Sequence, residues 1–304
     1  MTYRASGSQM RRHVVNREES TMGKRIVQGL AKAVFAVVLA MTWVTGAGAQ
    51  VISIHACQTL TTAGATYRLT DDIFACGDCL IVAANRITID LDGWGVVQDI
   101  GCYTGSGITD GGVAREQIVV KNGVTFSDLE GSFDYGIDLR ASNRTEVRTF
   151  GTIFNNIDGI AVGNRTLVKD CLSLLNLENG ISAGNFAQVQ ECGAYLNGFA
   201  GGDDLAGIRV GDRCLITQNE ASGNVDDGIL TGASCTVTHN TASFNESGIS
   251  VEGTNSLVSH NTTNDNYNEG IEVQCPGTVT HNHSSGNGED YVLEGTGCTF
   301  LNNN

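Results

Sequence analysis

The sequence predicts an all-β, single-domain right-handed parallel β-helix, a solenoid of about ten rungs of about 21 residues with a short N-terminal β cap. Two observations lead to this prediction. The dipeptide Gly-Ile recurs at close to this interval, with one longer step from Gly180 to Gly207, and asparagine recurs in two series at the same interval, one of them with a break between Asn197 and Asn224. A third supports it, because a single proline, Pro276, and few helix-forming runs after residue 85 leave no place for a long helix.

Both repeats follow from the physics of stacking, in which each turn buries its apolar residues only against its neighbours. We expect the Ile after each glycine to point inward, and the glycine to supply a corner backbone conformation that a Cβ would strain. We expect the asparagines to tolerate left-handed geometry and to form hydrogen-bonded ladders along the axis. The Gly-Ile pairs begin at Gly136, Gly159, Gly180, Gly207, Gly228, Gly248 and Gly270. The ladder positions are Asn219, Asn240, Asn261, Asn282 and Asn303, and Asn155, Asn176, Asn197, Asn224, Asn245, Asn266 and Asn287.

Residues 1–49 are predicted to be a secretory signal peptide. A basic stretch at residues 22–25 precedes a short apolar run, residues 33–44, and the small residues Ala47-Gly48-Ala49. We favour Met22 as the initiator. Because spanning a bilayer takes roughly 20 apolar residues, we expect no membrane insertion and a secreted protein, extracellular or periplasmic.

The rest of the chain divides into a cap and a solenoid. Residues 50–86 are predicted to form the N-terminal cap, and residues 87–304 the β-helix. No equivalent C-terminal cap is visible, and residues 302–304 continue the ladder register. The last rung therefore either exposes its edge or takes part in end-on self-association.

The mature chain, residues 50–304, is strongly acidic, with 11 basic and 31 acidic residues and a net charge of −20. Such a field repels nucleic acid and anionic membranes, and it suits cations, basic partners or neutral glycans. It is also compatible with a plainer role, since acidity keeps an exported protein soluble.

The ten cysteines fall into two groups by spacing. Cys171 and Cys192, like Cys214 and Cys235, are separated by one repeat length. Stacked rungs would bring each pair close with Cβ vectors side by side, so we expect free thiols in the core. The better disulfide candidates precede the first full rungs; they are Cys57, Cys76, Cys79 and Cys102. A metal or redox role for Cys76-Gly-Asp-Cys79 is the weaker alternative, because no second CxxC accompanies it.

The repeats, together with four N-terminal segments, resemble the NosD-like right-handed β-helix family over nearly all of the mature chain. The segments are Cys57-Gln-Thr-Leu60, Thr66-Tyr-Arg-Leu69, Cys79-Leu-Ile-Val82 and Ile87-Thr-Ile-Asp-Leu-Asp-Gly93. The resemblance implies a pectin-lyase-like scaffold, whose repeats occur in carbohydrate-binding proteins, sugar hydrolases, lyases and mannuronan epimerases. It implies a polysaccharide or cell-surface glycan as partner, and it does not determine whether the chain is an enzyme.

The longer step from Gly180 to Gly207 marks an insertion at residues 199–204, and acidic residues gather beside it. Convergent carboxylates can supply the acid and base of a polysaccharide hydrolase, lyase or epimerase. We therefore select Asp203, Asp204, Asp226 and Asp227 as catalytic candidates, and Arg209, Asp158 and Glu269 as substrate-binding candidates. Polygalacturonase and epimerase motifs such as Asp-Pro-His-Asp are absent. A non-catalytic structural or adhesive solenoid thus remains the main alternative, with the acids forming a solvated corner. No cofactor is required, although Ca²⁺ would suit these oxygen ligands.

His239, His260 and His281 form a third series, with the same period as the asparagines. Together with the family resemblance, they suggest a periplasmic metal-handling protein as a second alternative. However, residues on a straight column fan out in a row and do not converge on one ion. We therefore predict no metal site.

Overall fold

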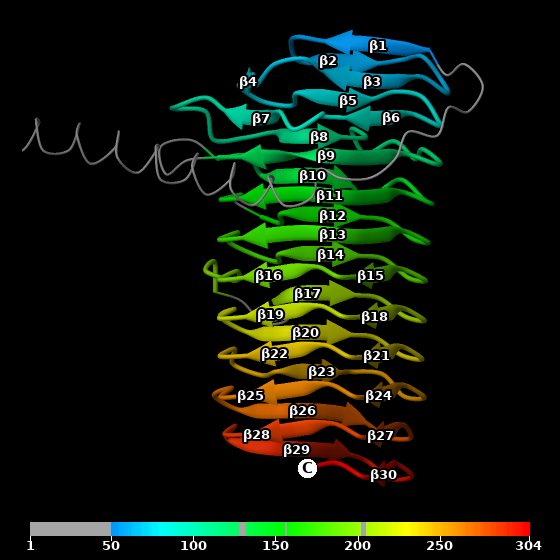
Figure 1. Cartoon of the computed structure of the whole chain (residues 1–304), viewed down its shortest axis with the longest axis vertical. Helices are drawn as coiled ribbons and strands as arrows, with labels where there is room; N and C mark the ends of the chain where they lie inside the picture. Colours follow the sequence, from blue (N-terminus) through cyan, green and yellow to red (C-terminus); the bar gives the residue numbers. More distant parts are fainter. Residues whose placement is uncertain (1–49, 128–131, 156, 202–204) are drawn as a thin grey trace, which may run out of the picture. The chain divides into compact units, whose positions relative to one another are not determined.

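A computed structural model describes residues 50–127, 132–155, 157–201 and 205–304, all within one compact unit, Gly48–Asn304. Its strands pair in parallel and belong to two sheets that wind around a common core (Figure 1). This confirms the predicted right-handed parallel β-helix. No helix among the described residues is long and apolar enough to cross a membrane.

Sheet B contains one strand from each rung. Nine of its strands follow residue 87, which is consistent with the expected repeat count. Its 11 strands are β2 (Gln58–Leu60), β5 (Leu80–Val82), β8 (Ser106–Thr109), β10 (Tyr135–Leu139), β12 (Ile160–Val162), β14 (Ile181–Ala183), β17 (Ala206–Val210), β20 (Asp227–Thr231), β23 (Ile249–Val251), β26 (Glu269–Gln274) and β29 (Glu289–Glu294).

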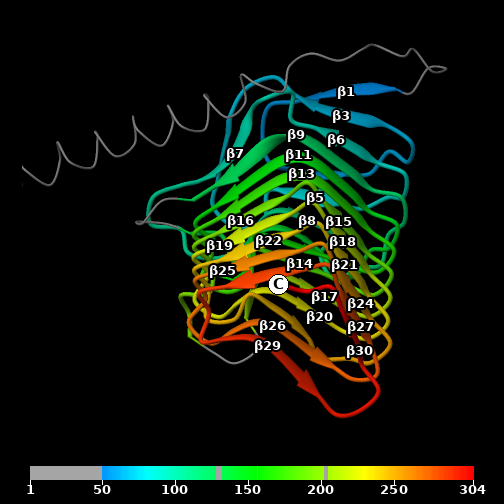
Figure 2. The same ribbon diagram turned by 60° about the horizontal axis from the view of Figure 1, so that its bottom comes forward.

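Sheet A forms the other two sides of the solenoid, and Figure 2 shows its two limbs meeting at an angle. Its 19 strands are β1 (Val51–Ile54), β3 (Thr66–Leu69), β4 (Ile73–Ala75), β6 (Thr88–Asp90), β7 (Gly95–Gln98), β9 (Val119–Phe126), β11 (Glu146–Ile153), β13 (Leu167–Leu174), β15 (Gln188–Gln190), β16 (Gly193–Tyr195), β18 (Leu215–Thr217), β19 (Glu220–Ser222), β21 (Thr236–Thr238), β22 (Thr241–Ser243), β24 (Leu257–Ser259), β25 (Thr262–Asn264), β27 (Thr278–Thr280), β28 (His283–Ser285) and β30 (Thr299–Leu301).

A typical rung contains three strands and three corners. The first corner follows the sheet B strand, the second separates the two sheet A strands, and the third leads to the next sheet B strand. In the rung of β20, β21 and β22, each strand directs one fully buried side chain into the core, namely Ile229, Val237 and Ala242. The same positions in neighbouring rungs are also apolar, because each turn needs its neighbours to cover them.

The asparagines form buried ladders, as predicted, but they do not adopt the left-handed geometry. Asn240 Oδ1 accepts hydrogen bonds from the backbone N–H and the Nδ2 of Asn219, at 2.9 and 3.0 Å. The left-handed residue is the one before each ladder position, such as His239 with a φ of 58°. The side-chain amide therefore stabilises a corner that its predecessor turns.

The Gly-Ile glycines are also required for another reason than expected. Their φ angles lie outside the left-handed region, so their backbone does not need glycine. A Cβ on Gly228 would instead lie 2.6 Å from both Asn245 Nδ2 and the carbonyl oxygen of Gly248. Close approach of the ladder amide and the next rung excludes a side chain there.

The cysteine predictions are confirmed, with one disulfide missed. Cys171, Cys192, Cys214 and Cys235 are free and buried. The N-terminal cysteines pair as Cys57–Cys79 and Cys76–Cys102, which contradicts a metal or redox CxxC, because Cys76 and Cys79 have different partners. A third disulfide, Cys275–Cys298, closes the last rungs.

The two ends join the same sheets as the centre. In the predicted cap, β1 pairs with β3 and β2 pairs with β5, all in parallel. The boundary at residues 86 and 87 stays a prediction. At the other end, Asn303 Oδ1 accepts a hydrogen bond from Asn282 Nδ2 at 2.9 Å, and β30 is exposed along its length. End-on association through this rung likewise stays a prediction.

Candidate functional site

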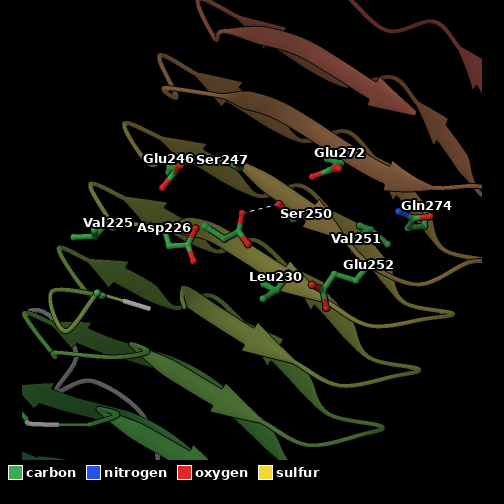
Figure 3. Close-up of a pocket in the computed structure, with 13 residues that line it drawn as sticks. Val225, Asp226, Leu230, Glu246, Ser247, Ser250, Val251, Glu252, Glu272 and Gln274 are labelled. Atoms are coloured by element: carbon green, nitrogen blue, oxygen red, sulfur yellow. Dashed lines mark hydrogen bonds between the residues drawn. The ribbon is translucent and has the colours of Figure 1, made fainter. Parts of the chain in front are cut away.

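A groove of about 730 Å³ lies where β20, β23 and β26 meet the third corner. Five carboxylates line it, those of Asp226, Asp227, Glu246, Glu252 and Glu272 (Figure 3). The wall between these carboxylates follows from the parallel register. Leu230, Ser250 and Glu272 stand opposite one another on successive strands, and all three line the groove. The groove is therefore acidic and spans several rungs.

Asp227 is a strongly perturbed acid of the groove. Its side chain is buried, and Ser250 Oγ donates a hydrogen bond to its Oδ1 at 2.6 Å. Burial raises the pKa of Asp227 to about 7, and the nearby charges of Asp226, Glu272 and Glu252 act in the same direction. At neutral pH this carboxyl is therefore able to donate a proton beside other carboxylates, which is the pairing that acid–base catalysis requires.

Replacing Asp227 by Asn should change stability only above acidic pH. The folded-state pKa of about 7 exceeds the ordinary value of 3.8, so the folded protein binds this proton more tightly than the unfolded chain. The stabilising contribution is full below about pH 4 and is lost as the pH rises to about 7. We expect Asp227→Asn to match the wild type at pH 4 and to exceed it at pH 8 by about 2–4 kcal/mol in urea unfolding. An equal difference at both pH values would contradict this assignment.

Asp226 connects the groove to the insertion. Its Oδ2 accepts a hydrogen bond from the backbone N–H of Leu205 at 3.0 Å, and the groove is also lined by Gly198, just before the insertion, and by Gly201 within it. The candidates Asp203 and Asp204 lie outside the described residues. The flanks of the insertion therefore border the groove, as the sequence suggested.

The three substrate-binding candidates take different positions. Arg209 is exposed and stands opposite Leu230, a residue of the groove wall, on the adjacent strand. Glu269 accepts a hydrogen bond from Ser247 Oγ at 2.7 Å, and Ser247 lines the groove. Asp158 is three rungs away from Asp227, roughly 14 Å at one strand spacing each. The structure therefore places Arg209 and Glu269 beside the groove and Asp158 outside it.

Asp158 belongs to a separate polar cluster on sheet B. It accepts hydrogen bonds from the backbone N–H and Nδ2 of Asn179, both at 2.9 Å, and burial raises its pKa to about 6. Nearby, Arg140 Nε forms an ion pair with Asp138 Oδ1 at 2.8 Å, and the guanidinium carbon of Arg140 lies 4.3 Å from the centre of the Tyr135 ring. Sequence reasoning missed Tyr135 and Arg140, and in the groove it missed Glu252 and Glu272. Arg140, Glu252 and Glu272 occupy outward positions after a Gly-Ile pair, which is the signal that could have identified them, whereas Tyr135 precedes its pair.

The histidine column forms a parallel stack. Ring centroids are 5.0 Å apart between His239 and His260, and 5.1 Å apart between His260 and His281. The Nδ1 atoms of His239 and His281 each form a hydrogen bond with the hydroxyl of the preceding threonine, at 2.9 and 2.8 Å. Within the described ranges, no group of three or more His, Cys, Asp or Glu side chains is arranged to hold a metal ion.

Comparison with solved structures supports the fold class. The A-module of mannuronan C-5 epimerase AlgE4 from Azotobacter vinelandii has a TM-score of 0.55 and 13% identity, over 79% of this chain and 86% of that chain. The A-module of AlgE6 from the same organism has a TM-score of 0.52 and 14% identity, over 78% and 88%. XylC in complex with xylose has a TM-score of 0.51 and 13% identity, over 64% and 38%. No protein-family model and no curated protein matches the chain.

These likenesses define the class of protein that the fold represents. The chain is a right-handed parallel β-helix protein, a fold that it shares with these modules. Sequence identities this low show a shared fold and do not show a shared activity. The narrower NosD-like resemblance stays a prediction.

Proposed function

We propose that the protein is exported and that it binds or processes a polysaccharide along the acidic groove. One observation carries the proposal, namely the buried Asp227 carboxyl, with a pKa of about 7, in an open groove beside ionisable acids. A groove spanning several rungs also suits a linear polymer. As an enzyme the protein would be a hydrolase, a lyase or an epimerase, with Asp227 as the proton donor and Asp226 or Glu252 as the base.

Two further observations support the proposal. The named function of the AlgE4 and AlgE6 modules is epimerisation of mannuronan, a polysaccharide, on the same scaffold. Three disulfides favour an oxidising compartment, in agreement with the signal peptide predicted for residues 1–49. In this proposal Asp203 and Asp204 remain catalytic candidates beside Asp226 and Asp227, and Arg209 and Glu269 contact the polymer.

A glycan array tests the proposal with the wild type, Asp226→Asn and Asp227→Asn, each with Ca²⁺ or with EDTA. We expect the wild type to bind at least one polysaccharide, and the groove variants to bind it on the order of tenfold more weakly, the usual effect of losing one charged hydrogen-bond partner. Glu220→Gln on the exposed face of sheet A removes the same charge and should change affinity less than twofold. Chromatography of the incubated polymer then separates binding from processing. Failure to bind or convert any uronate or neutral polysaccharide would overturn the proposal and favour the structural solenoid.

A further inference from the structure

The first corners of three consecutive rungs place Arg165, Phe186 and Arg213 in a row, called here the arginine row. All three residues have left-handed backbone, with φ of 56°, 60° and 58°. The guanidinium carbon of Arg165 lies 5.7 Å from the centre of the Phe186 ring, and that of Arg213 lies 5.4 Å from it. One phenyl ring therefore holds two guanidinium groups, at corners two rungs or roughly 10 Å apart.

The two guanidinium groups of this row are unlike most of the other arginines. Arg140, Arg144 and Arg148 each form an ion pair with a neighbouring carboxylate. Arg165 and Arg213 are exposed and form no ion pair or hydrogen bond through their guanidinium groups with any residue that the structure describes. In a mature chain with 31 acidic and 11 basic residues, two adjacent arginines without an acidic partner are unexpected for a solvated surface alone.

Neighbouring amides add further donors to the same corner. Asn164 Oδ1 accepts the backbone N–H of Asn185 at 2.8 Å, and Asn185 Oδ1 accepts that of Asp212 at 2.7 Å. Their oxygens are therefore engaged, while both side chains are exposed and their Nδ2 groups have no hydrogen bond to the described residues. Apart from the Asp212 side chain, the row presents donors, which suits a ligand rich in oxyanions.

We propose that the arginine row is a second binding site, which takes a linear polysaccharide bearing carboxylate or sulfate groups. Two fixed guanidinium groups form paired hydrogen bonds with successive oxyanions, and the asparagine amides donate to hydroxyl oxygens between them. A flexible acidic peptide would lose more conformational entropy on binding to so short a row. Duplex nucleic acid would extend beyond the row onto a surface of net charge −20.

This site is independent of the acidic groove. Arg213 follows the end of β17, whereas the insertion precedes its start. The charge preference is also opposite, because residues 214–304, which supply most of the groove, contain 11 acidic residues and no Lys or Arg.

Isothermal titration calorimetry at low salt tests the proposal. The ligands are a polygalacturonate oligomer, a sulfated glucan and an uncharged glucan of matched length. We expect the wild type to bind a charged glycan and not the uncharged one, with affinity falling as salt rises. The double variant R165Q/R213Q should bind at least roughly tenfold more weakly. The matched control R144Q/R148Q removes the same charge from arginines that already have acidic partners, and it should stay within twofold.

Several outcomes would overturn the proposal. They are an equal loss in the control variant, no binding of either charged glycan by the wild type, and binding of polyglutamate with no binding of charged glycans. Phe186→Leu should weaken binding while thermal unfolding shows an intact fold, because the ring positions the guanidinium groups. Asp227→Asn should leave this binding unchanged, which separates the site from the acidic groove.

Discussion

Asn240→Asp should destabilise the protein by about 3–5 kcal/mol at pH 7, the usual cost of an uncompensated buried charge. The substitution preserves the shape of the side chain and exchanges one donor for an acceptor. Asn240 is buried, and its Nδ2 donates to the carbonyl oxygens of Ile216 and Thr238 and to Asn261 Oδ1, at 3.0, 3.2 and 3.0 Å. A carboxylate oxygen there would face three acceptors.

The pH dependence of the Asn240→Asp variant follows from the same geometry. Burial among acceptors should raise the pKa of the new carboxyl above its unfolded value, so the folded state binds the proton more tightly. Its destabilisation should therefore be smallest at pH 4 and grow as the pH rises. Urea unfolding at pH 4 and pH 7 measures both, with Thr241→Ala, an exposed residue of β22, as the control, expected to cost less than about 1 kcal/mol. A loss at pH 7 no larger than that of the control would contradict a stabilising role for the ladder.

The ladder shows what a sequence repeat can predict. The constant period identified the residues that stack, because stacking is what imposes the repeat. It did not reveal how each residue acts. His239, and not Asn240, turns the corner, and the amide of Asn240 stabilises it from within. A residue that turns the corner and a residue that forms the hydrogen-bonded ladder both recur once per rung. The period therefore cannot tell which residue has which role.

The cysteines follow a related rule. The members of each free pair are one repeat length apart, in register with the ladder, whereas the bonded pairs have sequence separations of 22, 26 and 23. Register alone does not decide the outcome, because Cys57 and Cys79 directly precede the paired residues Gln58 and Leu80 and are themselves opposite each other. Cys275 and Cys298 are off the register of the neighbouring strands, where two Cβ atoms at a corner can turn toward each other. Their spacing, which departs from the repeat, was the signal that could have identified this pair.

The acidic groove was only partly predictable. The break in the repeat before Gly207 indicated its position, because an insertion interrupts the stacking that every other rung obeys. Glu252 and Glu272 were missed, because outward residues do not need to repeat and leave no period. Which of the acids lie close together depends on register and on burial, and so does the raised pKa of Asp227.

Gly159→Ala should destabilise the protein by about 3 kcal/mol, at the upper end of the usual cost of overpacking. A Cβ on Gly159 would lie 2.2 Å from Ser173 Oγ, 2.3 Å from Thr152 Oγ1 and 2.7 Å from Asn176 Nδ2. None of these atoms is free to move away. Ser173 Oγ donates to the carbonyl oxygen of Gly180 at 2.6 Å and accepts Asn176 Nδ2 at 2.9 Å, and Thr152 Oγ1 lies within hydrogen-bonding distance of it at 2.8 Å.

Gly151→Ala provides the matched control for the Gly159→Ala variant. Gly151 is also a buried glycine without left-handed backbone, but its nearest contact to a new Cβ would be Val124 Cγ2 at 3.4 Å, an ordinary van der Waals distance. We expect it to be neutral or stabilising by up to about 1 kcal/mol, because alanine reduces the entropy of the unfolded chain. Urea unfolding of both variants measures the difference. If Gly159→Ala were as stable as Gly151→Ala, the corner would have to yield to the methyl group, and the repeated glycine would need another explanation than close packing against the ladder.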